Sequence, residues 1–363
     1  MKKPLKILLF VLLALVLIVG GYVIYVFASY DRIEDNQVLD VNRPAQTTAE
    51  AAQVPTGETL SLTSWNIGFG AYTDDYSFFM DGGKYSRAFS KSAVVENLTA
   101  IGQELADFDT DFSLIQEVDI AATRSYQVDE SKMLVDSLDA NHSKYWTFAI
   151  NYDSPYLFYP ILEPHGASKA GLQTFSDYTI TSALRRSLPI QTDIAKVLDL
   201  DRCYAINRLP AANGKELILI NLHLSAYTTD PTIADRQLQM LYDDMVKEYE
   251  AGNYVICGGD FNKDLLGNSP EIFGVSGAEY SWAQPLPKDD IPEDFRLIAP
   301  FDADKTVPSC RNADAPWDPQ TNFQVTLDGF IVSDNITVLT SRVVDTQFAY
   351  SDHNPVQMEF RLS

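Results

Sequence analysis

The chain opens with one long apolar run, and shorter apolar segments follow it at spacings that change along the sequence. The run extends from Ile7 to Ala28 without a charged residue. As a helix it would be about 33 Å long, which matches a hydrocarbon core of about 30 Å. Lys2, Lys3 and Lys6 precede it, and such basic residues stay in the cytoplasm. The pattern predicts a cytoplasmic N-terminus over residues 1–6, a transmembrane anchor over residues 7–28, and a single-pass protein of the cell membrane whose remainder is extracellular.

A cleaved signal peptide is the alternative for this segment, because Val26-Phe27-Ala28 would suit as a cleavage site. The apolar run is longer than the roughly 7–15 residues of a signal peptide, which favours the anchor. Residues 29–58 are polar, rich in Ala, Gln and Thr, and have no regular period. They predict a linker between the membrane and a folded domain that comprises residues 59–363.

Two kinds of periodicity alternate through residues 59–363. Leu60 and Leu62 alternate with polar residues, which predicts an opening strand. Helical spacing recurs at Val94, Leu98, Ile101 and Leu105. Residues 216–224 are apolar on both faces until their end, which predicts a strand buried between two layers. Together these patterns predict an α/β (α+β) four-layer sandwich of two packed mixed or antiparallel sheets flanked by helices.

Two further segments have no clear period. Residues 263–322 are rich in Pro and Asp and predict long loops. Residues 152–161 hold Tyr156, Phe158 and Tyr159 between two prolines, which favours a core strand with flanking turns. A hairpin that dips into the membrane and a wall of the substrate cleft are the alternatives for this second segment.

The charge balance of the chain bears on whether it binds nucleic acid. The chain has 27 Lys and Arg against 50 Asp and Glu, for a formal net charge of −23. A field of this sign repels polyanions, which disfavours general binding of duplex nucleic acid.

We expect the protein to be a monomer. Cys203 and Cys310 could form a disulfide in an extracellular domain, and two unpaired thiols are the alternative.

Five short phrases place chemically active side chains where predicted strands end. They are Trp65-Asn66, Gln116-Glu117-Val118, Asn221-Leu222-His223, Gly258-Gly259-Asp260-Phe261-Asn262 and Ser351-Asp352-His353-Asn354-Pro355. Taken singly, a phrase such as residues 258–262 also fits an ordinary turn, because Gly, Asp and Asn dominate turns. In their order and spacing together, the five phrases resemble the active site of the endonuclease/exonuclease/phosphatase superfamily, which has a deoxyribonuclease-I-like fold. With the N-terminal apolar run, the chain resembles a membrane-anchored bacterial member of that superfamily.

The resemblance implies a divalent metal, Mg²⁺ with Mn²⁺ as an alternative, bound by oxygen donors. Mg²⁺ prefers a few carboxylates and waters to a complete protein cage. The resemblance assigns Glu117 to the metal, with Asn66 and Asp352 supporting it.

The resemblance also implies catalytic and substrate-binding roles. Asp260 would orient or deprotonate the attacking water. Asp328 would orient His353, which would act on the transition-state phosphoryl group, and His223 would contact phosphate oxygens or aid proton transfer. The expected substrate-binding residues are Asn262, Arg124 and Arg311. For Arg311, a structural ion pair is an equally weighted reading.

These expectations combine into a metal-dependent hydrolase that cleaves a phosphodiester or phosphomonoester outside the membrane by in-line attack of water. The acidic charge and the tether favour a small or membrane-borne phosphate ester. One alternative is an extracellular nuclease acting on DNA or RNA, with a basic groove built from Arg124, Arg185, Arg186 and Arg311. The alternative from another class is a non-catalytic ligand-binding ectodomain on the same fold.

Overall fold

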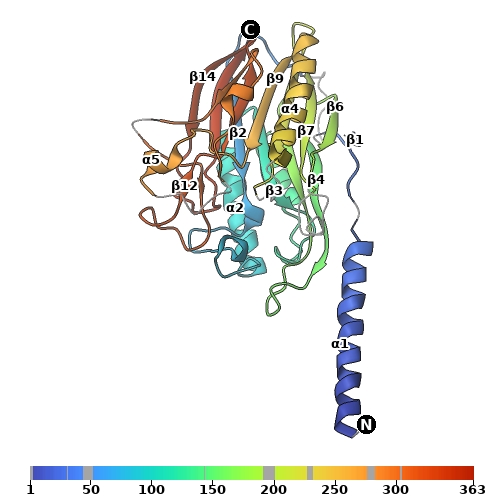
Figure 1. The fold of residues 1–363 in the computed structure, drawn as a ribbon. Helices are drawn as coiled ribbons and strands as arrows, with labels where there is room; N and C mark the ends of the chain where they lie inside the picture. Colours follow the sequence, from blue (N-terminus) through green and yellow to red (C-terminus); the bar gives the residue numbers. More distant parts are fainter. Residues whose placement is uncertain are drawn as a thin grey trace.

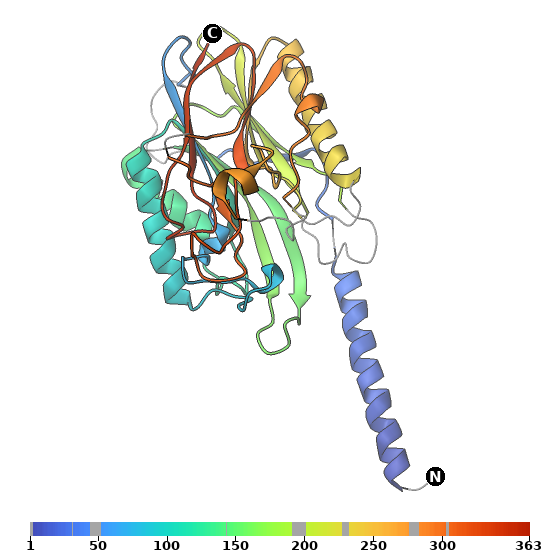
Figure 2. The same ribbon diagram turned by 60° about the vertical axis from the view of Figure 1, so that its left-hand side comes forward.

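Two β-sheets packed face to face form the body of the molecule. The computed structural model describes residues 3–30, 32–43, 52–142, 144–190, 201–226, 232–275, 283–302 and 305–363. Helix α1 (Lys3–Ala28) projects beyond the pair of sheets (Figure 1). Helices α2 (Lys91–Phe108) and α4 (Thr232–Glu250) cover opposite sides of the pair of sheets, as Figure 2 shows. The predicted four-layer sandwich is therefore confirmed.

The first sheet has seven strands in the order β1-β6-β7-β8-β9-β13-β10, and the second has six in the order β14-β15-β2-β3-β5-β4. The strands of the first are β1 (Gln37–Leu39), β6 (Ser182–Ser187), β7 (Cys203–Pro210), β8 (Glu216–His223), β9 (Tyr254–Asp260), β10 (Phe295–Ile298) and β13 (Asp328–Ser333). The strands of the second are β2 (Leu60–Asn66), β3 (Phe112–Asp119), β4 (Tyr145–Leu157), β5 (Gly166–Ser176), β14 (Ile336–Val343) and β15 (Val356–Leu362). The other described elements are η1 (Gly68–Gly70), η2 (Phe79–Asp81), α3 (Glu130–His142), α5 (Ser269–Phe273), η4 (Lys288–Asp290) and the pair β11 (Cys310–Arg311) and β12 (Gln324–Val325).

The core follows from the alternation of side chains along the strands. In β8, Leu217 and Leu219 belong to the apolar cluster between the two sheets. Ile218 and Ile220 belong to the cluster that α4 covers. On the far side, Leu98 of α2 packs in a third cluster against the six-stranded sheet. The predicted buried strand and the predicted helix are both confirmed.

Strand direction brings the ends of five strands to one edge of the sandwich. β2 and β3 are parallel and align Asn66 with Gln116. β8 and β9 are parallel and align His223 with Asp260, whereas antiparallel β13 begins at Asp328, opposite Asp260. The ends of β2, β3, β8 and β9 and the start of β13 thus form one edge, called the polar edge below.

Several described residues of the segment predicted as a polar linker, residues 29–58, pair with the domain. β1 lies within this segment and pairs antiparallel with β6. Val54 is buried in the core and forms an isolated bridge with Ala211. The buried guanidinium of Arg185 donates a hydrogen bond to the carbonyl of Glu34 at 3.1 Å. A three-residue strand has no measurable period, so this pairing could not be predicted from the sequence.

The structure corrects one further prediction from the sequence and decides between two alternatives that the sequence left open. The segment predicted as long loops, residues 263–322, carries β10, which pairs with β13 at the edge of the seven-stranded sheet. Cys203 and Cys310 are both buried and free, so the structure contains the unpaired thiols rather than the disulfide.

β4 and β5 form a long hairpin that projects beyond the body of the molecule, shown in green in Figure 1. The favoured reading of residues 152–161 as a core strand holds as far as Leu157, where β4 ends. The apolar residues after it are exposed, so the flanking turn is not part of the core.

The burial of His165, which directly precedes β5 in the turn of this hairpin, predicts a loss of stability in acid. It is buried, with Nδ1 3.2 Å from the carbonyl oxygen of Ser86, and burial together with the charge of Arg124 lowers the pKa of His165 from 6.5 to about 3. The unfolded chain therefore binds the proton first as the pH falls below about 6.5. We expect the free energy of unfolding to fall by up to about 2 kcal/mol between pH 6.5 and pH 5 from this group. Urea titrations of wild type and His165→Gln test this, because the variant should have the shallower pH dependence, and equal slopes would contradict it.

Candidate active site

Asp260, the last residue of β9, is the centre of the polar edge. Its Oδ2 accepts a hydrogen bond from Asn66 Nδ2 at 3.1 Å. The same oxygen lies 3.4 Å from His223 Nε2 and 3.8 Å from His353 Nε2. Its Oδ1 accepts a bond from the backbone N–H of Asn262 at 2.8 Å. Side chains from both sheets therefore converge on one carboxylate.

The buried position of Asp260 makes it a stronger base than an ordinary aspartate. Burial raises its pKa to about 6, against the opposing charge of His353 and with a further contribution from Asp328. A carboxylate with such a pKa is ionised at neutral pH and accepts a proton more readily than one with a pKa near 4.

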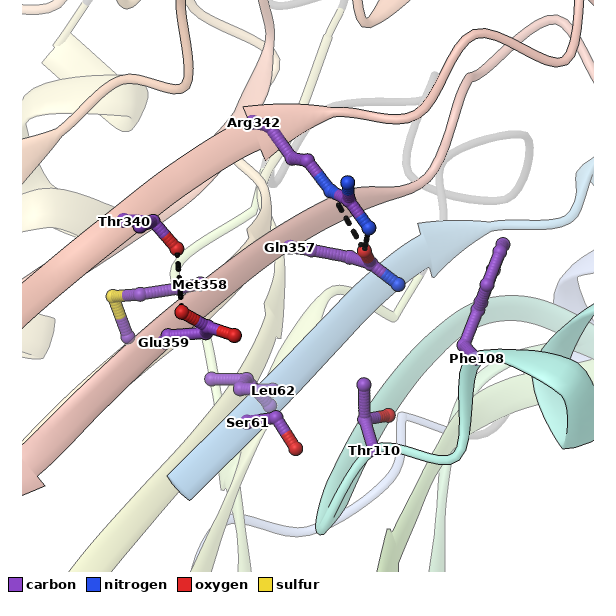
Figure 3. Close-up of a pocket in the computed structure, with 9 residues that line it drawn as sticks. All are labelled: Ser61, Leu62, Phe108, Thr110, Thr340, Arg342, Gln357, Met358 and Glu359. Atoms are coloured by element: carbon purple, nitrogen blue, oxygen red, sulfur yellow. Dashed lines mark hydrogen bonds between the residues drawn. The ribbon is translucent and has the colours of Figure 1, made fainter. Parts of the chain in front are cut away.

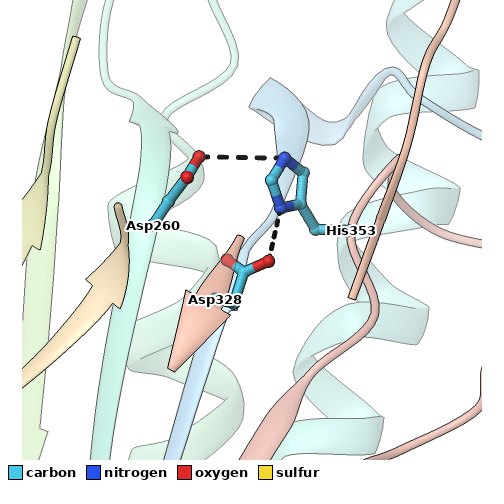
Figure 4. A group of neighbouring side chains, drawn as sticks. All are labelled: Asp260, Asp328 and His353. Atoms are coloured by element: carbon cyan, nitrogen blue, oxygen red, sulfur yellow. Dashed lines mark hydrogen bonds and ion pairs between the residues drawn. The ribbon is translucent and has the colours of Figure 1, made fainter. Parts of the chain in front are cut away.

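Asp328 orients His353, as Figure 4 shows. His353 Nδ1 lies 2.9 Å from Asp328 Oδ2, which leaves Nε2 on the side of Asp260. Ser309 Oγ donates a second hydrogen bond to the same Asp328 oxygen at 2.7 Å. Burial opposes the imidazolium charge, but Asp328, Cys310 and Asp260 outweigh it and raise the pKa of His353 well above its ordinary value. His353 is thus a cationic donor.

His223 has the opposite character. It is the last residue of β8, and its Nε2 faces Asp260 and lies 4.0 Å from Glu117 Oε1. Burial, with the charges of Arg202 and His353, lowers the pKa of His223 well below its ordinary value. The polar edge therefore holds one cationic and one neutral imidazole on either side of Asp260.

The three expected metal ligands lie at the polar edge. Asn66 Nδ2 donates to Glu117 Oε1 at 3.3 Å, and Glu117 has a positive φ of 57° where the pairing of β3 with β5 is irregular. Burial raises the pKa of Asp352 to about 7, against the charge of His353 and with a contribution from Glu117. Asn66 presents its amide nitrogen to the carboxylates, so it would have to turn its oxygen inward to bind a metal.

These residues fit a hard divalent cation. A Cβ on Gly68, at φ +51°, would lie 3.1 Å from Asp352 Oδ1 and 2.6 Å from the Tyr72 ring, so glycine keeps this approach to the carboxylate open. Asp260, Asp328 and His353 also offer ligand atoms within 4.8 Å of one another. Because His353 Nδ1 is bonded to Asp328 and Mg²⁺ prefers oxygen donors, the Glu117 side of the edge suits Mg²⁺ better.

The three expected substrate-binding residues all bond within the protein. Asn262 Nδ2 donates to the carbonyl of Leu224 at 2.8 Å. Arg124 forms a buried ion pair with Asp119 at 2.9 Å. Arg311 donates to backbone carbonyls, among them that of Thr73 at 3.0 Å. In this structure these contacts hold the loops around the polar edge.

Several supporting residues escaped the sequence reading. Ser309 has no motif around it, and its role depends on a loop that only the fold brings to Asp328. Gln116 Nε2 donates to Asn221 Oδ1 at 2.8 Å and so links the two sheets directly behind the edge. Ser351 Oγ donates to the carbonyl of Asn66 at 2.8 Å. Gln116, Asn221 and Ser351 all lie in the five phrases, which was the available signal.

A separate hollow lies over β2, β14 and β15, near the end of α2 (Figure 3). Its lining includes Arg342, whose guanidinium donates to Gln357 Oε1 at 2.7 Å, and Thr340, whose hydroxyl donates to Glu359 at 3.2 Å. None of the residues grouped around Asp260 lines it. The polar edge therefore remains the candidate site.

Comparison with solved structures supports the fold. An endonuclease/exonuclease/phosphatase from Beutenbergia cavernae DSM 12333 is similar with a TM-score of 0.57 and 15% identity, over 84% of this chain and 72% of that one. A family protein from Leptotrichia buccalis C-1013-b gives a TM-score of 0.55 and 12% identity over 83% and 99% of the two chains. ANGEL2, a 2',3'-cyclic phosphatase, in complex with adenosine-2',3'-vanadate, gives 0.55 and 16% over 89% and 98%.

Comparison of the sequence with protein-family models shows to which family the chain belongs. No curated protein matches the chain. The model of the Endonuclease/Exonuclease/phosphatase family matches residues 63–353, a span that begins in β2 and ends at His353. This span includes nine of the ten expected site residues between its limits and the tenth, His353, at its end. The chain therefore belongs to the endonuclease/exonuclease/phosphatase family.

Proposed function

We propose that the protein is a membrane-anchored, Mg²⁺-dependent phosphoesterase that hydrolyses a phosphate ester outside the membrane by in-line attack of water. The family comprises hydrolases acting on phosphate esters. One observation carries the proposal for this chain, namely that the buried carboxylate of Asp260 lies between His223 and His353 with Glu117 beside them.

The side chains divide the chemistry among them. Asp260 accepts the proton of the attacking water, for which its raised pKa suits it. His353, fixed by Asp328, donates from Nε2 to a phosphoryl oxygen as charge grows in the transition state. Neutral His223 donates a second hydrogen bond on the other side of Asp260. A divalent cation held at Glu117, Asp352 and Asn66 would neutralise the non-bridging oxygens.

Turnover of a substrate panel tests the proposal. The full-length protein in detergent would be assayed with Mg²⁺ or with EDTA on bis(p-nitrophenyl) phosphate, p-nitrophenyl phosphate, phospholipids, DNA and RNA. We expect Mg²⁺-dependent hydrolysis that Asp260→Ala abolishes, and the preferred substrate then separates a diesterase from a monoesterase. A folded protein that binds a phosphate ester but turns over no member of the panel would favour the ligand-binding ectodomain.

Replacing Glu117 with glutamine is expected to weaken Mg²⁺ binding by about tenfold or more, since it removes a charged oxygen donor from the proposed site. Isothermal titration of Mg²⁺ measures this without any substrate. Glu96→Gln, an exposed position on α2, is the matched control and should bind Mg²⁺ as wild type does. Equal affinities in wild type and Glu117→Gln would remove Glu117 from the metal site.

The four arginines that a nuclease would use to build a basic groove are bonded within the protein. Arg186 pairs with Asp35 at 3.1 Å, Arg185 donates to backbone carbonyls, and Arg124 and Arg311 are bonded as described above. All four arginines are therefore engaged by carboxylates or backbone carbonyls of the protein itself. This arrangement supports a substrate with few phosphates over a long polyanion.

The anchored location is part of the proposal. α1 is long and apolar enough to cross a membrane, with a mean hydropathy of 3.1 in its most apolar window and none of that window buried. The basic residues before it favour a cytoplasmic N-terminus and an outward-facing domain. Protease treatment of intact cells should remove the domain, whereas release of the domain into the medium would indicate the cleaved signal peptide.

A further inference from the structure

The turn between β4 and β5 exposes a group of large apolar side chains. Phe158, Tyr159, Ile161 and Leu162 form this hairpin tip, and Ile161 and Leu162 are 83% and 99% exposed. Single exposed apolar residues are common, but a contiguous apolar projection marks a surface that binds a partner or a membrane.

Helix α1 lies directly beside the hairpin tip. Tyr22 Oη accepts a hydrogen bond from the backbone N–H of Phe158 at 3.1 Å and donates to the carbonyl of Tyr156 at 3.2 Å. Tyr25 Oη accepts a bond from the N–H of Tyr156 at 3.1 Å. The rings of Tyr22 and Phe158 meet edge to face at 5.2 Å. The tip is thus joined to the helix that would cross the membrane.

These contacts determine the level along α1 at which the hairpin tip lies, and hence its depth in a membrane that α1 crosses. Tyr22 lies six residues before Ala28, the end of α1, and a helix rises about 1.5 Å per residue, so Tyr22 lies about 9 Å inside that end. Tyrosine side chains favour the membrane–water interface. An apolar group at this level would lie about 5–10 Å into the boundary between headgroups and acyl chains.

A second set of contacts fixes the domain to the residues that directly follow α1. Arg32 donates to the carbonyl of Leu188 at 2.6 Å, and Arg185 holds the carbonyl of Glu34. β1 then pairs with β6 within ten residues of these contacts. The domain is therefore attached to α1 both through the chain and through the hairpin, which defines its orientation relative to the helix.

The pairing of β3, β5 and β4 places the polar edge at the same end of the molecule as the hairpin tip. Asp119, near the end of β3, is aligned with Ala170 of β5 and through it with Tyr152 of β4. The hairpin continues to the pair Leu157–Gly166, five residues further, or about 16 Å along a strand. In Figures 1 and 2, α1 and the hairpin project from the same end of the domain.

We propose that the hairpin tip inserts into the outer interface of the lipid bilayer beside α1 and holds the polar edge facing the membrane. The proposal rests on the anchored phosphoesterase above and names its substrate class, a phosphate ester carried at the membrane surface. Apolar side chains gain by leaving water, and tip and helix together restrict rotation of the domain away from the bilayer.

Fluorescence quenching by lipids tests the location without any substrate. The three native cysteines are buried, so Leu162→Cys can be labelled selectively with an environment-sensitive dye in the full-length protein, reconstituted in phosphatidylcholine vesicles. Val38→Cys on β1 is the matched control, since Val38 is also apolar and is 78% exposed. We expect acyl-chain nitroxide lipids to quench the dye at position 162 at least severalfold more than at position 38.

Equal quenching at the two positions would overturn the proposal. Protection of position 162 from aqueous iodide without quenching by lipid would also overturn it, because a protein would then cover the tip. Ile161→Cys provides a second labelling position with the same expectation. If lipid quenching is found but the substrate panel shows no turnover, the membrane contact stands and the phosphoesterase proposal fails.

Discussion

Replacing Asp260 with asparagine is expected to lower kcat by about 10²–10⁴-fold, the contribution typical of a general base. The variant keeps the volume and the acceptor oxygen that the backbone N–H of Asn262 needs but cannot take a proton from water. Burial makes the charge of Asp260 unfavourable in the folded state, as its raised pKa indicates. The melting temperature should therefore stay the same or rise while activity is lost.

This combination separates a catalytic role from a structural one. Asp243→Asn, at an exposed position on α4, is the matched control and should keep both activity and melting temperature. Steady-state rates and thermal unfolding of the two variants measure the difference. An Asp260→Asn protein with a wild-type kcat would remove Asp260 from the role of base, and one with a lower melting temperature would assign it to stability.

The catalytic candidates could be found in the sequence because strand direction gathers them. Asn66, His223 and Asp260 each end a strand, and the ends of aligned strands meet at one edge whatever the details of packing. The apolar run within residues 216–224 was sufficient to place His223 at such an end. Local pattern therefore predicted the layers of the fold and the strand ends, and the resemblance of the five phrases selected the residues of the polar edge.

The parts that escaped prediction depend on contacts between distant residues. Arg124 was expected to bind substrate, but its position beside Asp119 follows from the tight turn after β3, and the sequence does not show whether an arginine finds a carboxylate or a ligand first. β1 pairs through three residues with β6, far along the chain. Exposure of the hairpin tip depends on how far β4 and β5 extend beyond β3. The hydrophobic pattern of the sequence does not predict this relative length.

Replacing Asp328 with asparagine is expected to lower kcat by on the order of 10²–10⁴-fold, although Asp328 itself need not touch the substrate. Asp328 Oδ2 fixes His353 through Nδ1 at 2.9 Å and is the largest favourable influence on the raised pKa of that imidazole. Without the negative charge, the hydrogen bond that orients His353 is weakened and the pKa of its imidazole falls. Asp334→Asn, exposed at the other end of β13, is the matched control.

A double-mutant cycle distinguishes positioning from an independent contribution. If Asp328 acts only through His353, the double variant Asp328→Asn/His353→Ala should be about as active as His353→Ala alone, because the second change removes nothing that remains in use. The kcat values of the two single variants and the double variant give the coupling directly. Rate losses that multiply would show that Asp328 contributes on its own, and the two residues would then have to be placed separately in the mechanism.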